Sequence, residues 1–348
     1  MTKQTPIVSI IMPAYNAEAT IRRSVGAILK QTEPSLELIV VNDGSKDGTE
    51  AVLRELAETD DRLRILTVPN GGPAKARNAG LEAVSPGTEY IMFSDADDEL
   101  LPDAAEAALR TAETEKADLV IFGFTIVNPD GTRNDYFEPR GSYTPENLGS
   151  ELANLYKANL LNQVWAKLFR ADLIRKNGIR FADYRWGEDR LFIFDCLEHL
   201  DRLAVLPECR YRYIMQAGES LITGYYDRKP DVCLLADRRA QELCSRFGVA
   251  EDGYFRYMFA KSEFSCLTNL YSPSCRLSRT EKRAYTARIV KDDRVKERCR
   301  GAAGGLPTRL VCAVLSSGNV TLGLAAASCT ARLGRIAPKL FQKIKHRK

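Results

Sequence analysis

Apolar runs that alternate with segments of helical periodicity limit the fold of this chain more than any other feature. The runs cover residues 8–12, 36–41, 63–68, 90–95 and 119–124. In the segments between them, apolar residues recur every three or four positions, which is the spacing of an amphipathic helix. Strands that are apolar on both faces and separated by helices are typical of a parallel sheet. The sequence therefore predicts an α/β fold with a mostly parallel sheet flanked by helices.

Short polar clusters follow four of these runs, at the point where each predicted strand ends. They are residues 15–16, 42–45, 71–73 and 95–97. Ligands of such sheets bind beyond the carboxyl ends of the strands. We therefore expect the four clusters to lie in one crevice.

The run Asp95-Ala96-Asp97-Asp98 carries three carboxylates within four positions. Carboxylates this close repel one another unless a positive group lies between them. Their oxygen atoms are the ligands that Mg²⁺ or Mn²⁺ prefers, and proteins usually share these ions with substrate phosphates. The alternative is an acidic turn before a helix that begins near Pro102, since proline and acidic residues are favoured in a first helical turn.

Residues 6–215 resemble the inverting family 2 glycosyltransferases that build bacterial cell-surface polysaccharides. The motifs that carry the resemblance occur in order at residues 8–16, 41–45, 71–78 and 94–98. The resemblance implies the GT-A fold, which is a Rossmann-like nucleotide-diphospho-sugar transferase fold. It also implies transfer of a hexosyl or N-acetylhexosaminyl group, with Mn²⁺ or Mg²⁺ on the diphosphate of the donor.

The resemblance assigns donor-binding roles to Pro13, Tyr15, Asp43, Lys75, Arg77, Asn78 and Asp95. Pro13 and Tyr15 would form a wall against the nucleotide base, and Asp43 would accept its ring N–H. Uracil offers that N–H, so a UDP-sugar is favoured. The alternatives are that Tyr15 is a packing residue at a helix entry and that Asp43 belongs to an ordinary Asp-Gly turn.

The resemblance further implies that Asp97 binds the metal and that Asp95 contacts the metal or the ribose. Lys75 and Arg77 would offset the charge of the diphosphate. Both cations are also compatible with an exposed helix face that binds nothing.

A second carboxylate is needed away from the metal, because the acceptor hydroxyl loses its proton as it attacks. Glu188 and Asp189 begin a predicted helix, and they resemble the Glu-Asp motif of the family. The resemblance implies that Asp189 is the base and that Glu188 supports it. Acidic residues are also common in a first helical turn because they favour the helix dipole.

Residues 162–169 resemble the acceptor side of the family, and Trp165, Lys167 and Trp186 are the acceptor-binding candidates. Sugars present C–H faces that pack against aromatic rings. Both tryptophans are equally compatible with a place in the core. Residues 211–213 resemble a segment that closes over the donor.

The resemblance, together with composition and charge, divides the chain into three predicted parts. Residues 1–215 would form the GT-A glycosyltransferase domain, residues 216–300 a helical appendage, and residues 301–348 a basic amphipathic tail that associates with the membrane. The tail contains eight Lys or Arg residues and no acidic residue. Residues 310–331 are uncharged but diluted by polar side chains, which favours a pair of interfacial helices over a bilayer span.

Ile336, Leu340, Phe341 and Ile344 lie at helical spacing beside the basic residues, as an interfacial helix on an anionic membrane requires. The alternative is a solvated basic tail. Nine cysteines without a C-x-x-C pair indicate reduced thiols, and residues 1–6 lack the pattern of a signal peptide. We therefore expect a cytoplasmic protein that is peripheral on the inner face of the plasma membrane and acts on a saccharide or polyprenyl-linked acceptor.

Two other functions compete with glycosyl transfer. A sugar-nucleotide pyrophosphorylase would carry a Gly-rich, basic phosphate loop after the first strand, whereas this chain has Pro13-Ala14-Tyr15-Asn16 there. A non-catalytic scaffold that binds glycans or nucleotides would be free to lose the carboxylates, whereas this chain retains them. Nothing in the sequence indicates a nucleic-acid partner, and the transferred sugar, the acceptor and the oligomeric state stay open.

Overall fold

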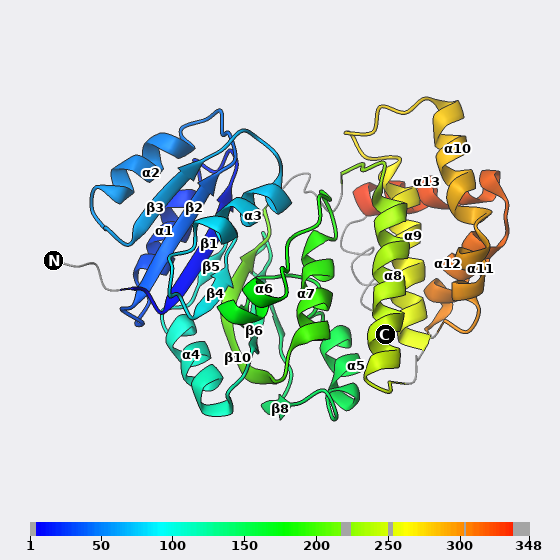
Figure 1. Ribbon diagram of the computed structural model, residues 1–348. Helices are drawn as coiled ribbons and strands as arrows, with labels where there is room; N and C mark the ends of the chain where they lie inside the picture. Colours follow the sequence, from blue (N-terminus) through cyan, green and yellow to red (C-terminus); the bar gives the residue numbers. More distant parts are fainter. Residues whose placement is uncertain (1–4, 217–223, 250–252, 303, 337–348) are drawn as a thin grey trace. The chain divides into compact units, whose positions relative to one another are not determined.

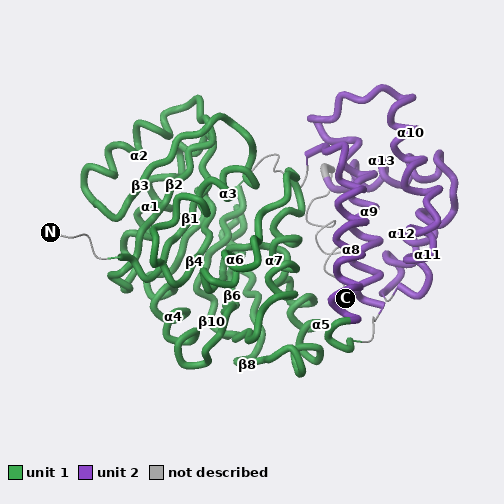
Figure 2. The backbone as a smooth tube through the Cα atoms, in the orientation of Figure 1, with its two compact units in different colours: residues 1–217, 246–249 green, residues 218–245, 250–348 purple. Residues whose placement is uncertain are grey.

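The computed structural model describes residues 5–216, 224–249, 253–302 and 304–336 (Figure 1). These residues form two compact units (Figure 2). The sheet unit contains residues 1–217 and 246–249, and the helical unit contains residues 218–245 and 250–348.

The sheet unit contains the alternating strands and helices that the periodicity predicted. Its strands are β1 (Val8–Ala14), β2 (Leu36–Asn42), β3 (Leu63–Thr67), β4 (Tyr90–Phe93), β5 (Glu99–Leu100), β6 (Leu119–Val127), β7 (Arg133–Tyr136), β8 (Gly141–Tyr143), β9 (Lys167–Arg170) and β10 (Leu203–Ile214). Its helices are α1 (Ile21–Leu29), α2 (Thr49–Ala57), α3 (Pro73–Ala83), α4 (Ala104–Glu115), α5 (Gly149–Lys157), α6 (Ala171–Lys176) and α7 (Glu188–His199). The five predicted strands correspond to β1, β2, β3, β4 and β6.

All the strands of the described residues belong to one sheet, in the order β3-β2-β1-β4-β9-β6-β10-β5, with β7 beside β6 and β8 beside β10. Strands β1 to β4 pair in parallel, as do β6 and β10. Strand β9 runs antiparallel between β4 and β6 and so separates two parallel sections. Its four residues are too few to show a period, and the sequence therefore gave no sign of this insertion.

Helix α3 packs closely against β1 and β2. A Cβ atom at Gly80 would lie 2.4 Å from Cγ2 of Ile11 on β1, so only glycine fits at this position. The close approach brings the polar residues of α3 within reach of the carboxyl ends of the strands.

An aromatic cluster holds the start of α7 against β4. Phe93 at the end of β4 packs edge-to-face on Phe181 and on Phe192 of α7, with ring centroids 5.3 and 5.7 Å apart. Phe181 and Phe192 are stacked at 4.1 Å. Since aromatic pairs have preferred geometries, the cluster orients α7 relative to the end of β4.

The helical unit contains α8 (Lys229–Arg246), α9 (Gly253–Asn269), α10 (Arg279–Val290), α11 (Asp293–Cys299), α12 (Leu306–Ser316) and α13 (Val320–Ile336). Helix α12 packs on α9 and α11, and α13 packs on α9 and α10, with Leu315 and Ala327 fully buried. Residues 306–336 therefore belong to the helical unit and do not form the separate tail that we predicted, because one face of each helix packs against other helices of the unit. Leu340, Phe341 and Ile344 lie outside the described residues.

Within the described ranges, no helix combines the length and the apolar character that crossing a bilayer requires.

None of the nine cysteines forms a disulfide, as their pattern predicted.

Candidate active site

Hydrogen bonds join the loops that follow β1, β2 and β4. The Asn16 N–H donates to Oγ of Ser45 at 3.0 Å, and Oδ1 of Asn16 accepts from the Lys46 N–H at 2.8 Å. Oγ1 of Thr20 donates to the carbonyl of Ala96 at 2.9 Å. These contacts bring the loops to one edge of the sheet, as the topology predicted.

Asp43 links the loop after β2 to the start of α3. Its carboxylate is buried and accepts the N–H groups of Gly71 at 2.7 Å and Gly72 at 2.8 Å. Gly72 has a φ of +88°, which glycine adopts without strain, and the chain then enters α3 at Pro73. Nδ2 of Asn70 also donates to Oδ2 of Asp43, at 3.3 Å. Asp43 therefore shapes this loop, and a carboxylate with three such bonds still has about one lone pair to offer a ligand.

Arg77 on α3 lies at the centre of a cluster of three carboxylates. Its Nη2 donates to Oδ1 of Asp95 at 2.9 Å. Its Nη1 donates to Oε1 of Glu188 at 3.1 Å and to Oδ1 of Asp189 at 2.8 Å. The guanidinium also lies 5.5 Å from the ring centroid of Phe181. Arg77 therefore joins the end of β4 to the first turn of α7.

We predicted that Arg77 offsets the diphosphate charge, with an exposed helix face that binds nothing as the alternative, and its position corrects the expectation of an exposed cation. Arg77 is only 4% exposed, and both of its terminal nitrogens hold protein carboxylates. The reason is the close packing of α3, because Ala74, Ala76 and Gly80 bring the helix near the sheet and bury the side chains between them.

The cluster holds more negative than positive charge when its carboxylates are ionised. Burial raises the pKa of Asp189 to about 7, with repulsion by Glu188 and Asp95 adding to the shift and Arg77 opposing it. Burial also raises the pKa of Glu188, again against Arg77. Burial by itself would lower the pKa of Arg77, but the three carboxylates raise it. Asp189 can therefore exchange a proton near neutral pH while Arg77 stays charged.

Lys167 lies in the interior and not in an acceptor groove, contrary to our prediction. It is fully buried, and its Nζ donates to the carbonyls of Gln163 at 2.7 Å and Trp165 at 3.3 Å. Burial lowers its pKa to about 7, although the nearby Asp189 opposes the shift. The reason is that Lys167 begins the central strand β9, whose neighbours cover both of its sides.

Trp165 also belongs to the core, which was the alternative to its predicted acceptor role. Its ring stacks on Tyr211 with centroids 4.6 Å apart and on Tyr213 at 5.6 Å. The neighbouring N–H of Val164 lies 3.4 Å from Oδ2 of Asp189. The segment therefore contacts Asp189 from the protein side.

Asp98 is turned away from the other two aspartates. Oδ2 accepts from the hydroxyl of Tyr211 at 2.8 Å, and Oδ1 accepts from the Ile214 N–H at 2.9 Å. The Tyr211 oxygen in turn accepts the N–H of Asp95 at 3.1 Å. Asp98 therefore fastens β10 to the acidic loop, and the buried Tyr211 supports the loop and does not close over a ligand.

Asp97 keeps the properties expected of a metal ligand. Burial and the neighbouring Asp95 raise its pKa to about 6. Its own backbone supplies the only hydrogen bond that its carboxylate receives within the described ranges, and Arg23 donates to its carbonyl oxygen at 2.6 Å. No group of three or more His, Cys, Asp or Glu side chains in those ranges is arranged to hold a metal. Two carboxylates fit an ion that takes its other ligands from a diphosphate.

Four other predicted site residues have side chains that are exposed or half-buried. Tyr15 is 48% exposed and Pro13 is half-buried, so both are accessible to a ligand. Lys75 is exposed, with Nζ 3.3 Å from Oδ2 of Asp183. Trp186 is half-buried in the loop before α7.

Asn78 uses its side chain on the backbone of Phe181, donating to the carbonyl at 2.8 Å and accepting the N–H at 2.9 Å. We predicted that Asn78 binds the sugar-nucleotide donor. In this structure its side-chain amide instead binds the backbone of the loop before α7. The sequence did not single out Phe181, although it contacts both Arg77 and Asn78. An isolated phenylalanine carries no signal for partners about 100 residues away.

Comparison with known proteins identifies the family. Residues 9–175 match the model of Glycosyl transferase family 2. Residues 9–175 of this chain therefore belong to that family. The chain is 32% identical over 213 residues to the uncharacterized glycosyltransferase EpsJ of Bacillus subtilis, and the aligned residues cover 60% of this chain and 61% of EpsJ. It is 41% identical over 128 residues to chondroitin synthase of Pasteurella multocida, which covers 36% of this chain and 13% of that one. The chain thus spans less than two thirds of the length of either relative.

Solved structures confirm the fold of this chain. TarS 1–349 of S. aureus, in complex with UDP-GlcNAc, aligns with a TM-score of 0.65 at 20% identity, over 94% of this chain and 92% of TarS 1–349. The mannosyltransferase PcManGT of Pyrobaculum calidifontis, in complex with GDP-Man and Mn²⁺, aligns with a TM-score of 0.51 at 16% identity, over 95% and 88%. The likeness to TarS confirms the predicted GT-A fold.

Proposed function

We propose that this family 2 glycosyltransferase transfers a sugar from a UDP-sugar to a hydroxyl group of a saccharide or lipid-linked saccharide, with inversion at the anomeric carbon. The observation that carries the proposal is the Arg77 cluster, which joins Asp95 after β4 to Asp189 at the start of α7. One end of the cluster lies beside the predicted metal ligand Asp97, and the other end is a carboxylate that titrates near neutral pH.

The donor proposal is supported by the open face of Tyr15 and by the lone pair that Asp43 retains beside Gly71 and Gly72. TarS, the neighbour with the higher TM-score, has been solved with UDP-GlcNAc. PcManGT has been solved with GDP-Man, so a guanosine donor is the competitor that an assay must include.

Asp97 and Asp95 are the residues that would hold Mn²⁺ or Mg²⁺. When bound, the ion neutralises the charge that develops on the leaving diphosphate. The support is the repulsion between the two carboxylates, which raises the pKa of Asp97 beyond the effect of burial and which a cation would relieve. Arg77 takes up one oxygen of Asp95, so Asp97 is the more available ligand.

Asp189 acts as the base in this proposal. The acceptor hydroxyl gives its proton to a carboxylate oxygen of Asp189 while its own oxygen forms a bond to the anomeric carbon. The bond from that carbon to the diphosphate oxygen breaks, and the nucleoside diphosphate leaves with the electron pair. Attack on the face opposite the diphosphate inverts the configuration. A pKa of about 7 lets Asp189 accept the proton at neutral pH, and Arg77 orients the carboxylate.

We also propose that the protein is cytoplasmic and that its helical unit binds the surface of an anionic membrane. Four of the seven exposed large apolar side chains in the described ranges lie on α12 and α13, at Leu306, Leu310, Leu322 and Leu333. The eight basic residues of 301–348 accompany them without any acidic residue. Apolar and basic residues together are typical of interfacial helices, and each basic residue near the surface contributes about 1 kcal/mol. A polyprenyl-linked acceptor would be met at such a surface.

The experiment that tests the enzymatic proposal is a donor screen with the purified protein and Mn²⁺ or Mg²⁺. UDP-GlcNAc, UDP-glucose and GDP-mannose are supplied with and without a polyprenyl-diphosphate-sugar acceptor, and hydrolysis, transfer and product configuration are measured. We expect turnover of a UDP-sugar with inversion. Asp189→Asn should lower transfer about 10²- to 10⁴-fold and leave UDP binding intact. Asp97→Ala should weaken the Mn²⁺-dependent binding of UDP.

Asp172→Asn is the matched control, because Asp172 is exposed and pairs only with Lys176 in the next turn. Near-parental transfer by Asp189→Asn would move the base to Glu188. Retention of configuration would overturn the one-base mechanism. Formation of a nucleoside triphosphate from a UDP-sugar and diphosphate would favour the pyrophosphorylase, and donor binding without turnover would favour the scaffold.

A further inference from the structure

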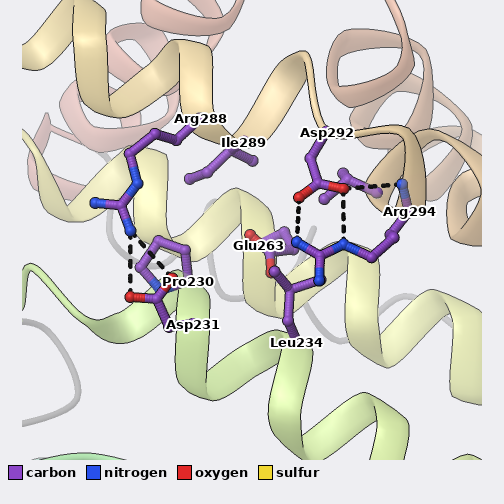
Figure 3. A pocket seen from close by; sticks show the side chains of 9 residues that line it. Pro230, Asp231, Leu234, Glu263, Arg288, Ile289, Asp292 and Arg294 are labelled. Carbon is purple, nitrogen blue, oxygen red and sulfur yellow. Dashed lines mark hydrogen bonds and ion pairs between the residues drawn. The ribbon is translucent and has the colours of Figure 1, made fainter.

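A pocket of about 200 Å³ lies in the helical unit, between α8, α9, α10 and the start of α11 (Figure 3). Pro230, Leu234 and Ile289 form apolar parts of its wall. Its charged residues are Asp231, Glu263, Arg288, Asp292 and Arg294. The proposed transfer reaction uses none of these residues.

Glu263 is the unusual member of the lining. It lies on α9 and is fully buried, and neither of its carboxylate oxygens has a hydrogen-bond partner. Burying a polar group without a partner is costly, and such groups usually have a ligand, an ion or a water beside them.

The two guanidinium groups of the pocket do not compensate Glu263, because each is held by another carboxylate. Arg288 donates to both oxygens of Asp231 at 3.1 and 3.2 Å. Arg294 donates to both oxygens of Asp292 at 3.1 and 2.6 Å. Figure 3 shows both pairs beside Glu263. The lining therefore has three carboxyl groups and two cations, and the unmatched group is the buried one.

We propose that this pocket binds a compact organic molecule that carries one ammonium group, with the ammonium at Glu263 and the carbon frame against Pro230, Leu234 and Ile289. An ammonium supplies the positive charge that the lining lacks and the hydrogen-bond donors that both Glu263 oxygens lack.

The size and the wall of the pocket favour an organic cation over a metal ion. Its volume is several times the share of one water molecule, about 30 Å³. A bare divalent ion needs more oxygen ligands than one buried carboxylate provides, and it gains nothing from an apolar wall. A second cavity of about 490 Å³ shares Asp231, Leu234 and Arg294 with this pocket, so a substituent on the amine has room to extend.

Binding of an ammonium should release a proton. Burial raises the pKa of the Glu263 carboxyl in the free protein, with smaller contributions from nearby acidic groups. The groups that face it are Asp231, Cys233 and Asp237 of α8, Tyr285 and Arg288 of α10, Asp292, and Arg294 and Cys299 of α11. Since the ammonium favours the ionised carboxylate, one proton leaves Glu263 as the ligand enters.

The test is calorimetric titration of the full-length protein with butylammonium, using n-butanol and glucose as neutral probes. Butylammonium stays protonated between pH 6 and 8, as a lysine side chain does. We expect it to bind, with release of about one proton seen in buffers of different ionisation enthalpy. Affinity should rise about tenfold per pH unit while Glu263 is neutral in the free protein.

Glu263→Gln keeps the shape and removes the charge, so it should abolish binding and proton release. Glu242→Gln is the control, because Glu242 is exposed on α8 and outside the pocket lining, and it should bind like the parent. Equal binding by Glu263→Gln and the parent would overturn the proposal. Binding of n-butanol or glucose as tight as that of butylammonium would also overturn it, since the site would then recognise hydroxyl groups or apolar surface.

Discussion

The Arg77 cluster of the sheet unit and Glu263 of the helical unit differ in whether a carboxyl group has a positively charged partner. In the sheet unit, Arg77 holds Asp95, Glu188 and Asp189, so every buried carboxylate of the cluster has a charged partner. In the helical unit, Glu263 is more deeply buried than these carboxylates but has none. Burial by itself disfavours ionisation in both places, and the partner decides whether the charged form persists. The comparison indicates that the carboxylates of the Arg77 cluster already have a protein cation, whereas Glu263 leaves a place for a ligand.

The largest effect should follow removal of the shared cation. Arg77→Met leaves three carboxylates without their partner, and breaking a buried ion pair in this way costs about 3–5 kcal/mol of unfolding free energy. Both tryptophans lie in the sheet unit, so urea denaturation followed by tryptophan fluorescence measures this loss.

The loss in Arg77→Met should depend on pH. Without the guanidinium, the carboxylates bind protons more tightly in the folded than in the unfolded chain, so the loss grows as the pH rises from about 4 to 8. Arg22→Met is the control, because Arg22 and Glu55 form a solvent-exposed pair whose removal should change the unfolding free energy far less. A loss no greater than that of the control would mean that the cluster does not hold the unit together.

The second effect concerns the pH dependence of transfer. Asp189 must be ionised to accept a proton, so kcat/KM should rise about tenfold per pH unit below pH 7 and level off above it. Glu188→Gln removes a repelling carboxylate and should move the midpoint to lower pH. A profile without an inflection between pH 5.5 and 8.5 would contradict the assignment of the base.

The same ionisation has the opposite effect on stability. The pKa of Asp189 is raised from its ordinary 3.8 to about 7 in the folded protein, so the folded state binds the proton more tightly. Its contribution to stability therefore falls as the pH rises through this window. Asp189→Asn should be more stable than the parent at pH 8, while it is far less active.

Removal of the unpartnered Glu263 carboxyl should raise the unfolding free energy, by less than the amount that Arg77→Met lowers it. Glu263→Met should stabilise the helical unit by about 1–2 kcal/mol, because it removes a buried polar group that has no partner. Since burial raises the pKa of Glu263, the gain should be greater at pH 8 than at pH 5. Hydrogen exchange of α9 in the full-length protein measures it. A loss of protection in the variant would mean that the carboxyl is satisfied in solution without any ligand.

The smallest effect on stability should come from the exposed leucines. Leu306→Ser with Leu310→Ser should change the unfolding free energy by no more than about 1 kcal/mol, because both side chains are exposed. The double variant should nevertheless lose much of the parent's co-sedimentation with anionic vesicles. Phe137→Ser, at an exposed position in the sheet unit, is the control and should bind vesicles like the parent. Equal binding by all three proteins would contradict the membrane proposal.

The sequence by itself determined the alternation of strands and helices and the edge at which the polar loops meet. Both follow from local properties: the apolar runs specify strands, and parallel strands bring their carboxyl ends together. It also singled out Asp95, Asp97, Glu188 and Asp189, because their motifs are contiguous in the chain.

Only the tertiary structure decided which side chains those residues contact. Arg77 looked like an exposed helix cation, but it bridges residues that lie 18, 111 and 112 positions away. Lys167 looked like an acceptor ligand, but a central strand buries it. Glu263 showed no pattern in the sequence. Local periodicity specifies the face of an element, whereas burial and partners depend on which other elements pack against that face, and no short stretch of sequence contains that information.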